Sequence, residues 1–214
     1  MKQGIFAVVT VLILSTVSFA TLIDDYAPEW RGNEGSTMQA WSFSDGSNPA
    51  TLDINGNPYG EPVLTLADSS LYLQSYFGAD GVWRVLSDQG INISIPNTDI
   101  TGPGTWKEII LQIVYVDPGS QIDPVSNEYP PLPIITDPGY TSLIRTSSVA
   151  VGNYLYDTYH IVISPNPTSE EIDILSIECA MYVDQIIVDT ICLPEPATVS
   201  LLGFGLVALL KRRK

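Results

Sequence analysis

The chain has 214 residues, with 24 Asp and Glu against nine Lys and Arg, and a formal net charge of −15. Lys2 and the last four residues account for five of the nine basic residues, which leaves four basic residues and a net charge of about −20 between the two ends. Such an excess of acid excludes nucleic acid as a partner, because phosphates repel it. It indicates either plain solubility or attraction of divalent cations and calcium-bridged acidic polysaccharide.

The first 20 residues predict a secretory signal peptide. Lys2 supplies the positive start, residues 5–17 are almost entirely apolar, and Ser18-Phe19-Ala20 places small residues before a cleavage site after Ala20. The chain is therefore expected to leave the cytoplasm through the Sec export machinery. A buried N-terminal strand or helix is the alternative, but the turn-rich sequence that follows disfavours it.

The C-terminal end combines an extended motif, an apolar run and a basic end. Pro194-Glu195-Pro196 precedes the apolar residues 197–210. A helix over this run would be about 21 Å long, short for a bilayer core of about 30 Å. We predict a short transmembrane helix whose cationic end stays in the cytoplasm, with the domain outside. The basic stop-transfer residues are Lys211, Arg212, Arg213 and Lys214.

This order of features resembles the PEP-CTERM sorting signal of Gram-negative-type bacteria. The resemblance covers about twenty residues and rests on Pro194, Glu195 and Pro196, the Leu/Gly-rich run and the basic end. It implies recognition by an exosortase-type membrane transpeptidase, removal of the tail, and association with the envelope or with extracellular polysaccharide. An ordinary single-span anchor is the alternative.

Residues 21–190 predict one all-β domain, and residues 191–214 form the sorting tail. Short apolar or alternating runs separated by Gly, Pro, Asn and Asp are typical of an antiparallel β-sandwich or jelly roll. We expect residues 117–140 to be a long loop and residues 190–194 a short linker. The predicted strands cover residues 37–43, 63–66, 71–73, 82–86, 91–95, 106–116, 159–163, 172–177 and 181–190.

Two segments resemble the edges of sandwich domains that accompany PEP-CTERM signals. They are residues 30–37, at the opening of the domain, and residues 182–190, at its close. The closing segment is also similar to the last strand of carbohydrate-binding jelly rolls, which implies glycan binding.

No catalytic pattern emerges from the sequence. His160 is the single histidine, and without a Gly-x-Ser-x-Gly motif it predicts a surface or packing role rather than a catalytic base. The sequence lacks a zinc-ligand pattern and a phosphate-binding glycine loop. The four tryptophans and eleven tyrosines are expected mainly in the core, although each type also binds sugars by stacking.

Two further features leave alternatives open. Asp53, Asn55 and Asn57 alternate like the oxygen donors of a calcium loop, and the same segment is typical of a hairpin turn. We expect the turn, with structural Ca²⁺ as the alternative. Cys179 and Cys192 can form a disulfide in an oxidising compartment, but a continuous strand between them would hold them too far apart.

We therefore expect a non-catalytic protein of the cell envelope or extracellular matrix that binds or organises extracellular polysaccharide. The alternative is a secreted carbohydrate-active enzyme with a jelly-roll catalytic domain, in which two acids of a concave sheet act as acid and base.

Overall fold

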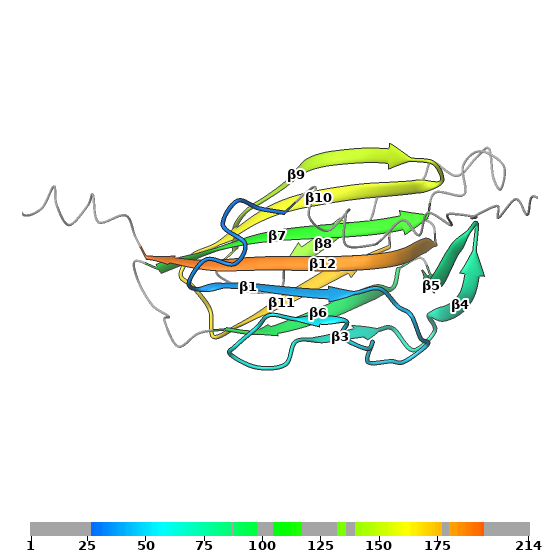
Figure 1. The fold of residues 1–214 in the computed structure, drawn as a ribbon, viewed down its shortest axis with the longest axis horizontal. Coiled ribbons are helices and arrows are strands. Elements are labelled where there is room, and N and C mark those ends of the chain that lie inside the picture. Colours follow the sequence, from blue (N-terminus) through cyan, green and yellow to red (C-terminus); the bar gives the residue numbers. More distant parts are fainter. Residues whose placement is uncertain are drawn as a thin grey trace, which may run out of the picture.

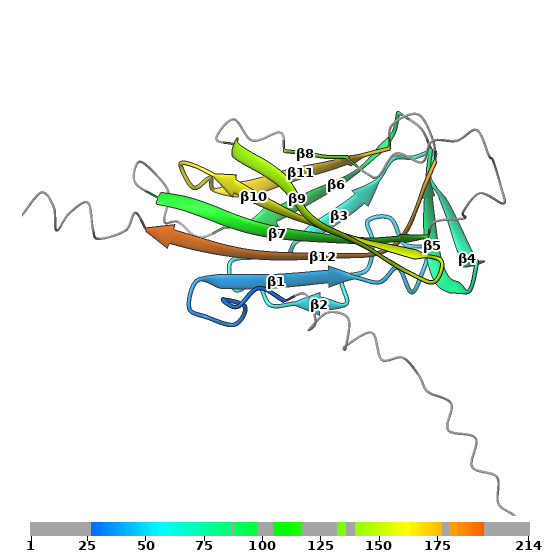
Figure 2. The same ribbon diagram turned by 90° about the horizontal axis from the view of Figure 1, so that it is seen from above.

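The computed structural model describes residues 27–86, 88–97, 105–116, 132–135, 140–176 and 180–194. Over these residues the fold is all-β, as predicted, with antiparallel strands in two sheets that face each other (Figures 1 and 2). In chain order the strands are β1 Ser36–Trp41, β2 Ile54–Asn55, β3 Val63–Leu66, β4 Leu71–Tyr76, β5 Ala79–Val85, β6 Gly90–Pro96, β7 Thr105–Val116, β8 Leu132–Ile135, β9 Tyr140–Val151, β10 Tyr154–Ile163, β11 Ser169–Leu175 and β12 Met181–Pro194.

The larger sheet has the order β2-β1-β12-β7-β10-β9, and the β4–β5 hairpin joins it at the start of β12. The smaller sheet has the order β3-β6-β11-β8. Strand β12 is therefore central, between the first strand of the domain and the long strand β7. Because its partners come from distant parts of the sequence, the sheet closes only when the end of the chain is in place.

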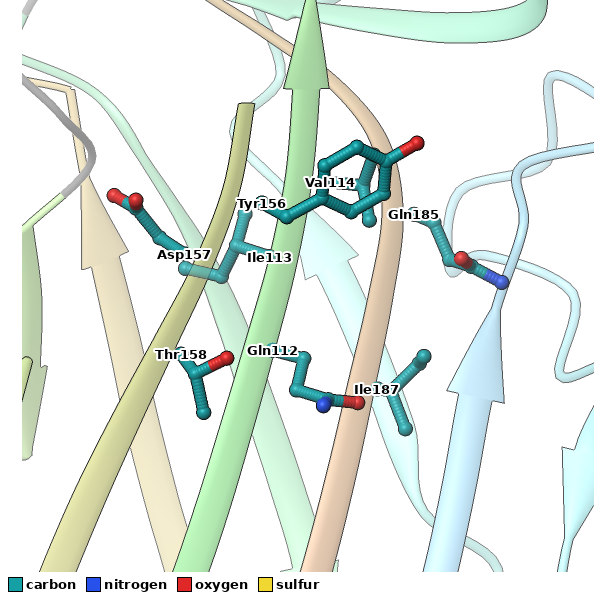
Figure 3. A pocket seen from close by; sticks show the side chains of 8 residues that line it. All are labelled: Gln112, Ile113, Val114, Tyr156, Asp157, Thr158, Gln185 and Ile187. Atoms are coloured by element: carbon teal, nitrogen blue, oxygen red, sulfur yellow. The ribbon is translucent and has the colours of Figure 1, made fainter. Parts of the chain in front are cut away.

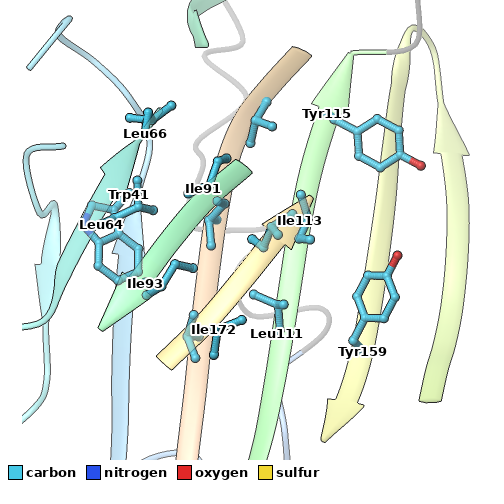
Figure 4. Packing of buried hydrophobic residues seen from close by; sticks show 14 of the residues in the cluster. Trp41, Leu64, Leu66, Ile91, Ile93, Leu111, Ile113, Tyr115, Tyr159 and Ile172 are labelled. Atoms are coloured by element: carbon cyan, nitrogen blue, oxygen red, sulfur yellow. The ribbon is translucent and has the colours of Figure 1, made fainter. Parts of the chain in front are cut away.

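The core lies between the two sheets and follows the alternation read from the sequence. Ile109, Leu111 and Ile113 of β7 are fully buried. Figure 4 shows Leu111 and Ile113 facing Ile93 of β6 and Ile172 of β11. Gln112 and Val114, on the other face of β7, are also almost inaccessible. Strand β7 is therefore covered on both faces.

The N-terminal segment of the domain is fixed to the outer face of the larger sheet. Arg31 donates from Nε and Nη2 to the two carboxylate oxygens of Asp189, each over 2.6 Å. Burial raises the pKa of Asp189, while the guanidinium opposes that shift. The bidentate pair holds the segment before β1 against β12.

Two expectations about segments were wrong, and one strand was not predicted. Residues 190–194, predicted as a linker, continue β12, because Thr190 to Pro194 pair with Ile109 to Thr105 of β7. The predicted loop 117–140 contains β8, which pairs with β11 and completes the smaller sheet; residues 117–131 and 136–139 lie outside the described residues. Strand β9 was not predicted, since its many Ser and Thr residues hide the pattern, and it pairs with β10 along an edge.

Candidate functional site

Strand β12 connects the two ends of the sandwich. It spans 14 residues, or about 45 Å at roughly 3.3 Å per residue. Its first residues pair with β5, and its last residue pairs with Thr105 at the start of β7. The β4–β5 hairpin therefore lies at the end opposite to the one from which the C-terminal tail departs (Figure 1).

A cleft of about 650 Å³ opens beside the β4–β5 hairpin. One wall is the hairpin, and the other is the loop that follows β1. The lining residues are Ser42, Ser44, Tyr72, Gln74, Asp80 and Gly81. The set offers an aromatic ring, an amide, two hydroxyls and one carboxylate, which is the chemistry of a site for a polar ligand with an apolar face.

The aromatic ring in the cleft has a fixed position. The Tyr72 ring is half-buried and lies 5.5 Å from the Trp83 ring, tilted at 58°. The Tyr72 hydroxyl donates to the Ser44 carbonyl over 3.4 Å. Since Trp83 belongs to the core, the Tyr72 ring is supported from behind and does not need to be ordered by a ligand.

The loop after β1 reaches the hairpin only because glycine is present on the hairpin side. Gly81 has a φ of +79°, and a Cβ there would lie 2.1 Å from the Phe43 carbonyl oxygen. The loop is tied internally by Asp45, whose carboxylate accepts from the Ser47 N–H and the Thr51 hydroxyl. These bonds, first of all those from Ser47, lower the pKa of Asp45, which favours the ionised carboxylate that accepts them.

Behind the cleft lies a second carboxylate, Asp184 of β12. It is 6% exposed, and burial followed by the charge of Asp80 raises its pKa to about 7. The same environment raises the pKa of the Tyr154 hydroxyl, mainly by burial. Stacked rings of Tyr76 and Tyr182, with centroids 4.2 Å apart, complete this end of the sheet. Asp184 is therefore a carboxyl group that gains and loses its proton near neutral pH.

A third carboxylate is buried inside the wall of the sandwich. Oδ2 of Asp157 accepts from the hydroxyls of Tyr115 at 3.2 Å and Tyr159 at 3.3 Å, and it lies 3.4 Å from Nη1 of Arg145. The two tyrosine rings point toward each other in Figure 4. Burial and the Asp157 charge raise the pKa of both hydroxyls, so both stay protonated as donors. The cluster stabilises the β7–β10 wall.

A small hollow on the outer face of the larger sheet is too small for a sugar. It lies between β12, β7 and β10, where Gln112, Gln185 and Ile187 surround it, and its volume is about 10 Å³ (Figure 3). That volume accommodates about one water molecule. Asp157 also lines the hollow, although its carboxylate points away from Gln112 and Ile187 in this view.

In the predicted calcium loop, the side-chain oxygens accept hydrogen bonds from backbone N–H groups. Asp53 accepts from the Ser42 N–H, Asn55 from the Asn57 N–H, and Asn57 from the Tyr59 N–H. The bonds accepted by Asn55 and Asn57 are those of consecutive turns, whereas Asp53 ties the segment to the residue that follows β1. Among the described residues there is no group of three or more His, Cys, Asp and Glu side chains that could hold a metal ion. Calcium binding by this segment stays a prediction.

His160 lies on the surface of a strand, and two of the four tryptophans lie in the core. The His160 Nε2 lies 2.9 Å from a Glu108 carboxylate oxygen on the outer face of the larger sheet. Trp41 and Trp83 are core residues, as predicted, while Trp30 and Trp106 are half-buried.

The cleft residues Tyr72, Gln74 and Asp80 and the carboxylate Asp184 were missed. Two runs were predicted as strands around residues 71–73 and 82–86, but they were not joined. The sequence signal for a hairpin between them was Phe77-Gly78, which connects the paired residues Tyr76 and Ala79. Both turn residues have positive φ, 51° and 89°, as a two-residue hairpin turn requires.

Several predicted residues lie outside the described part of the chain. These are the signal-peptide residues up to Ala20, Cys179, Glu195, Pro196 and the basic end at Lys211, Arg212, Arg213 and Lys214. Cys192 carries a free thiol. Within the described ranges no helix has the length and apolar character needed to cross a membrane. Of the predicted sorting residues Pro194, Glu195 and Pro196, the structure describes the backbone of Pro194, which ends β12.

Residues 193–214 match the PEP-CTERM protein-sorting motif. This confirms the resemblance seen in the sequence. The motif indicates an exported protein that is held transiently in the membrane before an exosortase sorts it. The chain matches no curated protein and no solved structure.

Proposed function

We propose that this exported protein, which carries a PEP-CTERM sorting motif, is a non-catalytic protein of the cell envelope or extracellular matrix whose cleft binds polysaccharide. The observation that carries the proposal is the position of Tyr72 in the cleft. Its ring packs against Trp83, and Ser42, Gln74 and Asp80 line the cleft with it. A sugar ring has an apolar face for the tyrosine and hydroxyls for the polar side chains.

The location of the cleft also favours this function. The sorting tail leaves one end of the sandwich and the cleft opens at the other, about 45 Å away along β12. A domain attached through its tail would direct the cleft away from the membrane. Its net charge of about −20 favours neutral glycans, or acidic glycans bridged by calcium, over nucleic acid.

The test is binding of the full-length protein, in detergent, to a panel of neutral and acidic polysaccharides, with calcium and with chelator. Tyr72→Ala should weaken binding about tenfold, because an aromatic contact contributes about 0.5–1.5 kcal/mol beyond its buried area. Tyr59→Ala is the matched control, since Tyr59 is 39% exposed and does not line the cleft. Absence of binding across the panel in both conditions, or equal loss in the two variants, contradicts the proposal.

A second candidate function is hydrolysis of a glycan at the same end of the domain. One observation favours it, since Asp184 is buried near Asp80 and its pKa rises to about 7, as expected of a general acid with a partner carboxylate. This enzyme would release reducing ends from a polysaccharide, and Asp184→Asn would abolish release while leaving binding intact. A flat result with the unmodified protein across the panel removes this candidate.

A further inference from the structure

The end of β12 belongs to two functional units at once. The strand pairs with β7 up to Pro194, and the sorting motif begins at residue 193. The two units therefore share Leu193 and Pro194, which pair with Trp106 and Thr105. The domain passes into its sorting signal without a spacer.

A buried polar network holds this end of the strand. Lys107 is fully buried and forms an ion pair with Glu170 of the opposite sheet, which is also fully buried. The Lys107 ammonium also donates to Asn97 Oδ1 over 2.8 Å. Because Lys107 lies on β7 and Glu170 on β11, the ion pair connects the two sheets where the core ends.

The same network includes the last residues of β12. The Cys192 thiol donates to Asn97 Oδ1 over 3.2 Å and lies 3.5 Å from Nδ2 of Asn166. Asn97 donates to Asn166 Oδ1 over 2.6 Å. Burial, the largest influence, raises the pKa of the Cys192 thiol, so it stays protonated as a donor. Cys192 is directly opposite Lys107 in the sheet register, two residues before the end of the strand.

A peptide-cutting enzyme needs these residues in another state. Its active site is a cleft that takes an extended segment and satisfies backbone groups on both sides of the bond it cuts. Leu193 and Pro194 lie against β7, and on the other side of β12 the Cys192 N–H donates to the Gly35 carbonyl. A bulky sandwich end therefore occupies the space that the enzyme requires.

We infer that the folded domain and the exosortase compete for Leu193 and Pro194, so that the end of β12 must detach from β7 before the tail is cut. The network around Lys107 then sets how often the motif is accessible. This inference concerns processing and does not depend on what the cleft binds.

The test follows the conversion of tail-bearing to tail-free protein in the native host after a pulse of synthesis. Insertion of six Gly and Ser residues between Cys192 and Leu193 leaves residues 193–214 intact and separates the motif from the sheet. This variant should be processed at least threefold faster. The same six residues inserted at the exposed turn Gly152–Asn153 are the control and should leave the rate unchanged.

A second variant prevents the end of β12 from separating from β7. Trp106 and Leu193 are opposite each other and half-buried, so Trp106→Cys with Leu193→Cys places a cross-strand disulfide outside the Lys107 network. Processing should slow at least fivefold and recover when dithiothreitol is added. Each single cysteine variant is the control for the change of side chain.

A spacer variant processed at the parental rate overturns the inference, as does a disulfide variant that is processed normally. Failure of all variants, parent included, to lose the tail overturns it together with exosortase sorting. Polysaccharide binding is measured separately on the same proteins, so loss of that binding refutes the proposed function and leaves this inference standing.

Discussion

At the tail end of the sandwich, the buried ammonium of Lys107 is paired with the buried carboxylate of Glu170. At the cleft end, the buried carboxylate of Asp184 lies within reach of a second carboxylate, Asp80, and its pKa rises to about 7. The two ends thus bury charge in opposite ways. Opposite charges join the two sheets at the tail end, whereas like charges make the cleft end sensitive to pH.

The largest expected effect is at the tail end. Lys107→Met leaves Glu170 buried without its cation, and loss of one partner of a buried pair costs about 3–5 kcal/mol of unfolding free energy. Urea unfolding of the full-length protein measures it. The double variant Lys107→Met/Glu170→Met should recover most of the loss. Equal free energies of unfolding for the parent and Lys107→Met would mean that the ion pair does not stabilise this end of the sandwich.

The second effect concerns the shape of the cleft. Gly81→Ala places a Cβ about where the Phe43 carbonyl oxygen lies, in a backbone conformation that disfavours side chains. We expect a loss of about 2–4 kcal/mol and loss of polysaccharide binding. Gly78→Ala is the control. Its φ is also positive, +89°, but nothing lies within 4 Å, so about 1 kcal/mol is expected. Similar melting temperatures for the two variants contradict the tight contact.

The third effect is a pH dependence that the tail end should lack. The pKa of Asp184 is raised from 3.8 to about 7 in the folded protein, so the folded state holds this proton more tightly than the unfolded chain. Stability from this group is complete below about pH 4 and is lost as pH rises to about 7. The change is on the order of 2 kcal/mol after allowance for partial solvation. Urea unfolding from pH 4 to 8 should show a steeper fall in stability in the parent than in Asp184→Asn, which keeps the contribution of the buried Asp189.

The smallest expected effect is that of Asp53→Ala, and it tests whether this segment is only a turn or also binds calcium. Asp53 is exposed and accepts one backbone hydrogen bond, so Asp53→Ala should cost about 0.5–1.5 kcal/mol. If the segment is a turn, chelator leaves the melting temperature of the parent unchanged. A melting temperature that rises with millimolar calcium in the parent and not in Asp53→Ala would establish the calcium site instead.

Local patterns were enough to predict most of the fold. Alternation in residues 91–95 and 106–116 predicted β6 and β7, since one face of each strand is buried against the other sheet. Strand β9 escaped because it has exposed residues such as Arg145 and Thr146 along its edge, which carry no apolar period. The linker expected at residues 190–194 failed for another reason. Its pairing with β7 depends on residues more than 80 positions earlier in the chain.

The candidate cleft could be predicted only in fragments. A Phe77-Gly78 turn is readable as a hairpin signal, and Tyr72 as an aromatic on a strand. Their approach to Ser42 and Ser44 depends on the contact between Gly81 and the Phe43 carbonyl, which no local pattern encodes. The raised pKa of Asp184 likewise depends on burial by distant strands.

The sequence by itself determined the sorting motif, the acidic character and the all-β class, because these depend on local composition, order and period. The tertiary structure alone decided that the motif starts inside a paired strand, that Lys107 meets Glu170 across two sheets, and that a cleft opens at the far end. The physical reason is that pairing, burial and the pKa of a buried group depend on residues brought together by long-range strand order, which local patterns do not specify.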